Sequence, residues 1–437
     1  PRMLTLDYAA RIHEQRQEFE LAFQTLGDAM QGIHAWRRET RSDEAKLAGP
    51  TKLWLDVLDH YVHVATRLNK SDKAFEAIEL GKAAAMLDLL ASASSRKRED
   101  RIKGSDAERQ AFLAKANELR AQIQTEQAKA ESTQLASIQR SLVLVEDKAR
   151  RLKEDTASWK IELLTPQKAE SLTLPDTQKL LGQAKATLIE YWGTNCVAVV
   201  TADGLRIQTL KPPLPSETLA VYRDAILAQS AALRGLEIHK DVAKAPDTDR
   251  VRALGKTLYD SLIRPLEAEI KTSLVFIAPD RELNFLPFQS LHDGQQYAAE
   301  KWTIAYVPSA SVLKLCVDKR KKAGSRVLAL GNPNLSDPKY KLVHAEEEVK
   351  AIARLFPEAK VLVGNEASEK ALQLLGPDFD VLHFACHGTV NLDDPELSCL
   401  RLAPDGDNDG YLHVRELFDM HFGAGLVTMS ACESGLG

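Results

Sequence analysis

Two apolar segments of the sequence each end near a residue that could take part in nucleophilic catalysis. "DVLHFACHG" (380–388) carries His387, and "GLVTMSACESG" (425–435) carries Cys432. Both segments have the composition of buried strands, and parallel α/β sheets bind their ligands beyond the carboxyl ends of the strands. The sequence therefore predicts that His387 and Cys432 emerge at the same edge of one sheet and meet there.

This pair of side chains has the chemistry of an acyl-transfer site. A free thiol ionises near pH ~8.5, so a neighbouring base must take its proton before it can attack a carbonyl at neutral pH. Imidazole can accept that proton and later give it to a leaving amine. Gly388 lets the backbone approach a substrate carbonyl closely, and its amide, with that of Cys432, is the predicted oxyanion donor. This chemistry needs no cofactor.

Metal binding is the alternative chemistry for the same region. Zinc sites usually combine two closely spaced ligand pairs, and no second pair is present here, so we predict no metal. "DGDNDGYLHVRE" (405–416) has the acidic spacing of an EF-hand loop, but the segment before it reads as a strand, which favours a solvated hairpin turn. Calcium remains open as an alternative. For zinc the candidate ligands are His383, Cys386, His387, His413, His421 and Cys432; for calcium they are Asp405, Asp407, Asp409 and Glu416.

The neighbouring residues have simpler interpretations. His383 lies on the same strand face as His387. We predict a structural role for His383, because His387 is the one that lies at the end of the strand, where a ligand would bind. Cys386 points to the opposite face and is expected to be a small core residue.

Composition narrows the class of protein. The chain has 437 residues, a formal charge of −5 and 44% hydrophobic residues, as in ordinary globular proteins, and is long enough for two or three domains. Its five cysteines show no paired spacing, and no apolar run reaches membrane-spanning length, so we predict a cytoplasmic protein. The short basic runs at 94–100 and 318–326 read as linkers, which leaves nucleic acid at most an indirect partner.

The pattern of apolar residues changes along the chain. Helical periodicity dominates residues 1–100 and is typical of helical hairpins, with a tetratricopeptide-like repeat as one interpretation. In the second helix pair, Trp54 and Leu58 on one helix and Phe75 and Ile78 on the next are predicted to form apolar faces.

Residues 101–165 are polar and helical, as expected for a projecting hairpin or linker. Ser105 and Glu108 have the spacing of a capping box and predict a helix start there. From 166 to 437 apolar strands alternate with helices, which predicts an α/β domain whose sheet is mostly parallel and flanked by helices.

The motifs together identify a family. "HFACHG" and "SACESG", preceded by "LVFIAPDRELNFLPFQSL" and "HAEEEVKAIARLFP", resemble the CHAT domain, a caspase-like family associated with tetratricopeptide repeats. "AFEAIELGKAAAMLDLLA" resembles the helix that commonly leads into it. The resemblance implies a caspase-like fold and a catalytic dyad of His387 and Cys432 beside Gly388. Asp393, Asp394 and Glu396 are candidates for a substrate pocket, because related peptidases that cut after basic residues use acidic groups.

The predicted function is a bacterial-type cysteine endopeptidase that cleaves a protein substrate and is regulated by a protein or complex docking on its N-terminal helices. A non-catalytic adaptor that binds protein partners is the alternative. CHAT domains continue beyond the cysteine motif, and the chain lacks an initial methionine. We therefore expect a fragment truncated at both ends, with little activity when it is made alone.

Overall fold

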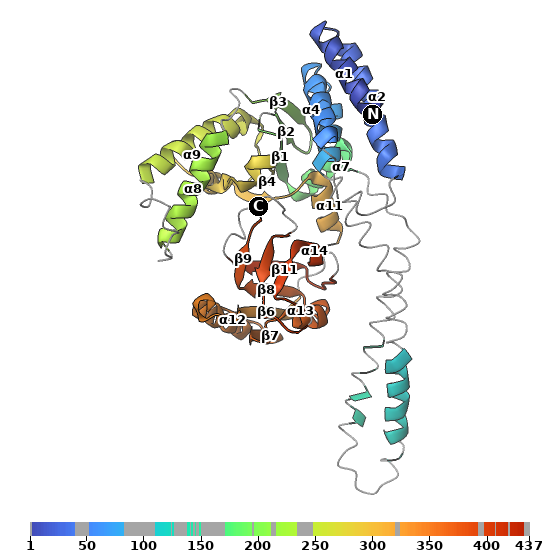
Figure 1. The fold of residues 1–437 in the computed structure, drawn as a ribbon, viewed down its shortest axis with the longest axis vertical. Helices are drawn as coiled ribbons and strands as arrows, with labels where there is room; N and C mark the ends of the chain where they lie inside the picture. The colour runs from blue at the N-terminus through green and yellow to red at the C-terminus, as the bar shows by residue number, and fades with distance from the viewer. Residues whose placement is uncertain are drawn as a thin grey trace. The chain divides into compact units, whose positions relative to one another are not determined.

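The computed structural model describes most of the chain, which folds as two compact units, residues 1–85 with 171–437 and residues 86–170 (Figure 1). The described ranges are 2–39, 52–82, 110–123, 171–194, 196–210, 216–233, 248–319, 324–391, 397–406, 408–417 and 420–431, with scattered positions between 125 and 149. The three-part division at 100 and 165 stays a prediction.

The unit of residues 86–170 is described mainly through one helix at 110–123. The rest of the predicted hairpin, including the proposed helix start at Ser105 and Glu108, lies outside the described residues.

The N-terminal part of the larger unit consists of successive helices. Their bounds are α1 Arg2–Gln15, α2 Phe19–Glu39, α4 Lys52–Arg67 and a helix at 71–82. The apolar face predicted for the second pair is confirmed, because Trp54, Leu58, Phe75 and Ile78 are all buried. Whether these hairpins form a tetratricopeptide repeat stays a prediction. Within the described ranges, no helix has the length and apolarity required to span a bilayer.

A mixed five-stranded sheet follows, in the order β3-β2-β1-β4-β5. β1, β2 and β3 form an antiparallel meander, while β4 and β5 run parallel to β1. β1 and β2 are buried along their whole length, as continuous apolar runs predict. The bounds are β1 Ala186–Trp192, β2 Cys196–Val200, β3 Leu205–Thr209, β4 Leu274–Ala278 and β5 Thr303–Tyr306.

Helices cover both faces of this sheet. One face shares a core with the N-terminal helices, and the other packs against α8 and α9. The helices of this region are α7 Leu174–Ala184, α8 Ser216–Leu233, α9 Thr248–Leu262, α10 Ala298–Lys301 and α11 Ala310–Asp318, with short 3-10 turns η1 Arg264–Glu269, η2 Arg281–Phe285 and η3 Phe288–Ser290.

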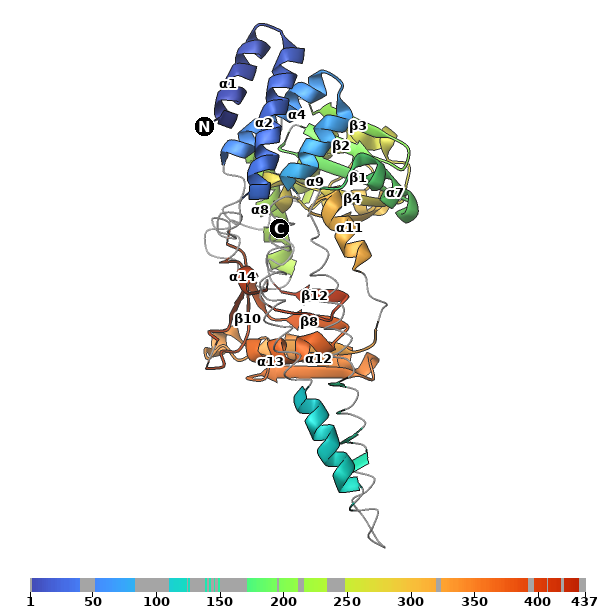
Figure 2. The same cartoon turned by 90° about the vertical axis from the view of Figure 1, so that its right-hand side faces the viewer.

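A second sheet is entirely parallel, in the order β12-β8-β6-β7. α12 packs on one of its faces and α13 on the other (Figure 1), and Figure 2 shows β12 beside β8. The bounds are β6 Val327–Pro333, η4 Pro338–Tyr340, α12 Val343–Leu355, β7 Ala359–Gly364, α13 Glu369–Leu375, η5 Gly376–Asp378, β8 Val381–Ala385 and β12 Leu426–Ser430. Gly331 in β6 allows α12 to approach closely, since a Cβ there would lie 2.8 Å from the Ala345 carbonyl oxygen.

A small antiparallel sheet, β11-β10-β9, lies between β8 and β12 in the sequence. Its strands are β9 His387–Thr389, β10 Cys399–Arg401 and β11 Tyr411–His413, followed by α14 Val414–Leu417. The α/β fold class and the helical N-terminal region are confirmed. The division of the strands into separate sheets was not visible in the sequence, because apolar periodicity identifies strands but not their partners.

Candidate active site

The strands that lead to the two predicted catalytic residues are neighbours. β8 and β12 pair in parallel, with Val381 opposite Leu426 and Ala385 opposite Ser430. His387 follows β8 after one intervening residue, and Ala431 is the first residue after β12. Cys432 itself lies outside the described residues, so its meeting with His387 stays a prediction.

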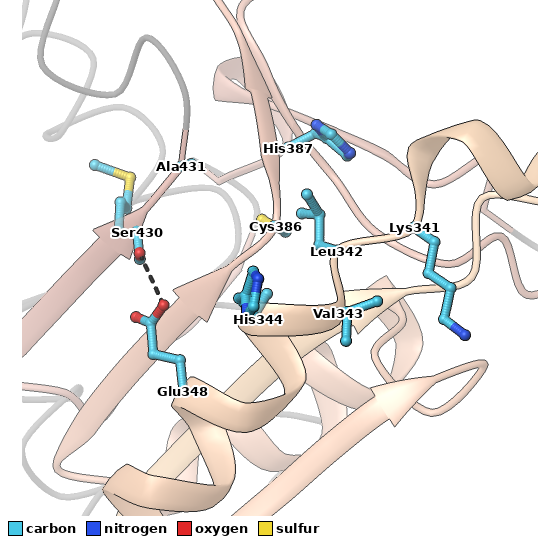
Figure 3. Close-up of a pocket in the computed structure, with 11 residues that line it drawn as sticks. Lys341, Leu342, Val343, His344, Glu348, Cys386, His387, Ser430 and Ala431 are labelled. Carbon is cyan, nitrogen blue, oxygen red and sulfur yellow. Dashed lines mark hydrogen bonds between the residues drawn. The ribbon is translucent and has the colours of Figure 1, made fainter. Parts of the chain in front are cut away.

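A cavity of about 650 Å³ opens at this edge of the sheet (Figure 3). Three segments form it: the start of α12, the chain just after β8 and the end of β12. Its lining residues are Lys341, Leu342, Val343, His344, Ala345, Glu348, Cys386, His387, Met429, Ser430 and Ala431. His387 and the residue that precedes Cys432 therefore line one cavity.

The His387 ring is oriented by the segment before α12. Its Nε2 lies 2.9 Å from the carbonyl oxygen of Tyr340, and the Tyr340 ring meets it edge-on with 5.7 Å between ring centres. A carbonyl oxygen can only accept, so Nε2 carries the hydrogen. In the neutral ring the lone pair is then on Nδ1, which is the nitrogen able to take a proton from a thiol.

Arg401 contacts the Tyr340 ring. It is paired with His387 across β9 and β10, and its guanidinium lies 6.0 Å from the centre of the Tyr340 ring and 3.8 Å from that of Tyr411. Such contacts are cation–π interactions. Neither Arg401 nor Tyr340 was predicted from the sequence, because no local sequence pattern relates an arginine to a tyrosine 61 positions away.

A hydrogen-bonded chain joins α12 to the end of β12. Glu348 accepts from His383 Nε2 at 2.9 Å and from Ser430 Oγ at 3.2 Å, and His383 Nδ1 lies 2.5 Å from the Thr428 hydroxyl. Both ring nitrogens of the buried His383 are thus used, which agrees with the structural role predicted for it. Glu348 was missed, since it is one of three consecutive glutamates in the sequence.

Cys386 is a poor candidate for a nucleophile although it reaches the cavity lining. It is 2% exposed, and burial, with a smaller effect of Cys399, raises the pKa of its thiol to about 12. A thiol that stays protonated at neutral pH is inert.

The other predicted site residues have different outcomes. Gly388 lies in β9 opposite Leu400. Its role as an oxyanion donor stays a prediction. Asp393, Asp394 and Glu396 lie outside the described residues, so the structure neither supports nor opposes a substrate pocket there.

The acidic segment 405–416 is a hairpin connection rather than an EF-hand. Strands β10 and β11 flank its loop where an EF-hand requires helices. Asp409 accepts from the Tyr411 amide and Glu416 from the His413 amide, and Gly410 has a φ of 83°. Among the described residues, no three histidine, cysteine or carboxylate side chains are arranged to hold a metal ion. Asp407 is not described.

Glu369 is a buried carboxyl at the start of α13, close to this loop. It is 1% exposed, and neither carboxyl oxygen has a side-chain or backbone hydrogen bond that meets normal geometry. Burial, followed by repulsion from Glu416, Asp409 and Asp405, raises its pKa to about 7. The carboxyl is therefore protonated in the folded protein at pH values where it is ionised in the unfolded chain.

This carboxyl makes stability depend on pH in a defined direction. As pH rises from about 4.5 to 7, the folded state binds the extra proton, so the free energy of unfolding should fall by about 3 kcal/mol. Glu369→Gln keeps the neutral shape and should remove most of this fall, which urea unfolding at pH 5 and pH 8 would measure. The exposed Glu366→Gln is the control. Parallel pH profiles for Glu369→Gln and the unsubstituted protein would contradict the assignment.

Comparison with known proteins adds one assignment. Residues 252–437 match the family model of the CHAT domain. No curated protein matches the chain.

Proposed function

We propose that the protein is an endopeptidase that cleaves a protein substrate with His387 and Cys432, because residues 252–437 match the model of the CHAT domain, a caspase-like cysteine peptidase family. The match begins at Arg252, within the predicted 166–437 domain, and includes both residues. The proposal names no cofactor, because thiol and imidazole suffice for the chemistry.

One observation carries the proposal. His387 and Ala431, which is covalently joined to Cys432, line the same cavity at the ends of two adjacent parallel strands. The thiol therefore begins one peptide bond from the wall that also holds the imidazole. A cavity of about 650 Å³ has the volume of a typical ligand site.

The proposed reaction has two halves. His387 Nδ1 takes the proton of the Cys432 thiol, and the sulfur attacks the scissile carbonyl carbon to form a tetrahedral oxyanion, to which the amides of Gly388 and Cys432 are proposed to donate. The intermediate collapses to a thioester as the imidazolium protonates the departing amine. Water, deprotonated by His387, then attacks the thioester and releases the acid product and the free thiol.

The N-terminal helices are proposed to receive a regulatory protein or complex in the cytoplasm. Their physical link to the rest of the unit supports a coupling, because Glu79 of the helix at 71–82 hydrogen bonds to residues 310 and 311 at the start of α11.

The test is cleavage of the natural partner by the intact protein. Cys432→Ala should abolish cleavage, because no other group replaces the attacking sulfur. Cys316→Ala removes an exposed thiol on α11 and is the matched control, with turnover expected unchanged. Cleavage that persists in the Cys432→Ala variant would refute the dyad. A partner that binds but is cut by neither form would instead indicate the adaptor function.

A further inference from the structure

The cavity has one carboxylate among its described lining residues. Glu348 lies on α12, and its side chain is 37% exposed. In Figure 3 its carboxylate points toward Ser430, at the end of β12. This placement puts a negative charge on the wall that also carries Ala431, the residue before the proposed nucleophile.

The carboxylate is held in place. His383 Nε2 and Ser430 Oγ donate to different oxygens of Glu348, which fixes its rotamer before any ligand arrives. The Thr428 hydroxyl can donate to Nδ1 of His383, so the neutral imidazole satisfies the whole pattern.

The other charged groups of the lining interact with residues other than Glu348. The Lys341 side chain is directed away from Glu348 in Figure 3, and Lys341 acts on Glu346, whose pKa is lowered mainly by its hydrogen bond with Lys350 and to a smaller degree by Lys341. His344 is almost fully exposed and contacts Glu347 at 3.2 Å. The partial positive charge of the α12 N-terminus is offset by Glu346 in the first turn.

The remaining surface is partly apolar, with Leu342, Val343 and Met429 on the lining. Apolar walls with one fixed carboxylate suit a long aliphatic side chain that ends in a cation. We propose that Glu348 determines specificity, by binding the lysine or arginine side chain of a substrate next to the scissile bond. This inference rests on the proposed peptidase function.

Binding tests the inference without requiring turnover. The probes are two blocked peptides that differ only in one residue, lysine or its neutral isostere norleucine, titrated against the intact protein carrying Cys432→Ala. The lysine peptide should bind roughly tenfold to a hundredfold more tightly, as expected for a charge-assisted hydrogen bond. Equal affinities, or no measurable binding of the lysine peptide, would overturn the proposal.

Variants then locate the charge. Glu348→Gln should remove the preference, while Glu348→Asp, which keeps the charge, should retain part of it. Glu347→Gln on the same helix is the control, because Glu347 is 72% exposed and contacts His344. A Glu348→Gln variant that weakens both peptides equally would show that Glu348 only positions β12. Loss of the preference on neutralising Asp393, Asp394 and Glu396, but not Glu348, would also overturn the proposal.

Cleavage by the protein with Cys432 present separates the two hypotheses. Cys432-dependent cleavage without a basic preference would retain the peptidase and refute the role of Glu348. Charge-selective binding without any cleavage would retain the Glu348 site and refute the peptidase.

Discussion

Replacing His387 with alanine should lower kcat/KM for the natural substrate by about 10²- to 10⁴-fold, the usual contribution of a positioned general base. The Tyr340 carbonyl accepts the Nε2 hydrogen and so leaves Nδ1 as the proton acceptor in the neutral ring. Without the imidazole, the thiol must ionise unaided. The residual rate of the variant should therefore rise with pH until about 8.5, where free thiols ionise. A pH–rate series on the purified intact protein measures both effects.

The matched control is another histidine of the same small sheet. His413 Nδ1 donates to the Leu397 carbonyl oxygen, and the amide of His413→Asn can replace that hydrogen bond. This variant should keep the rate and the pH profile of the unsubstituted protein. If His387→Ala loses less than tenfold and its pH profile is unchanged, then His387 is not the base and the proposed mechanism fails.

Replacing Glu79 with alanine should lower the free energy of unfolding by about 3 kcal/mol, because it leaves buried amides without an acceptor. Glu79 is 0% exposed. It accepts from the amide of Ala310 at 2.7 Å and from the amide of Ser311 at 3.0 Å, and the Ser311 hydroxyl also bonds to it. A carboxylate at this position also stabilises α11, because the N-terminus of a helix carries a partial positive charge.

A neighbouring acid opposes part of this effect. Burial and the nearby Glu79 hold the pKa of Glu190 well above its usual range. Removing Glu79 therefore relieves some repulsion, which is why the expected loss lies at the lower end of the 3–5 kcal/mol typical of breaking a buried charge pair.

Glu76→Ala provides the control for Glu79→Ala. Glu76 lies three residues earlier on the same helix, is 49% exposed and pairs with Lys73 at 2.9 Å. Exposed pairs contribute about 0–1 kcal/mol, so urea unfolding should hardly change. The Glu79→Gln variant, which keeps one acceptor oxygen, should fall between the two. Equal urea midpoints for Glu79→Ala and Glu76→Ala would show that α11 does not depend on this contact.

Local patterns in the sequence were enough to predict several features. The apolar runs at 186–192 and 381–385 are strands, and the i, i+4 apolar face containing Trp54 and Leu58 is buried. The sequence also predicted that the segments carrying His387 and Cys432 lie side by side. β8 and β12 confirm this for the strands, because ends of parallel strands meet at one sheet edge.

Other features depend on contacts between distant parts of the chain. Glu348 could not be separated from Glu346 and Glu347, since all three are exposed-type residues of one helix turn. Only the packing of α12 against β6, made possible by Gly331, directs Glu348 toward His383 and Ser430. The sequence gives one local indication that Glu79 is unusual, because it is an acid beside Ile78 on the buried face of its helix. Its role as an acceptor, however, depends on the amide of Ala310, which is 231 positions away.

The amino-acid sequence by itself indicated the main helices and strands, the buried faces and the resemblance to the CHAT domain, because each depends on periodicity or on a short motif. The tertiary structure alone decided which carbonyl orients His387, which carboxylate lines the cavity and which acid caps α11. Each of those contacts joins residues that no local pattern relates, and hydrogen bonds form only where folding has brought the partners within about 3 Å.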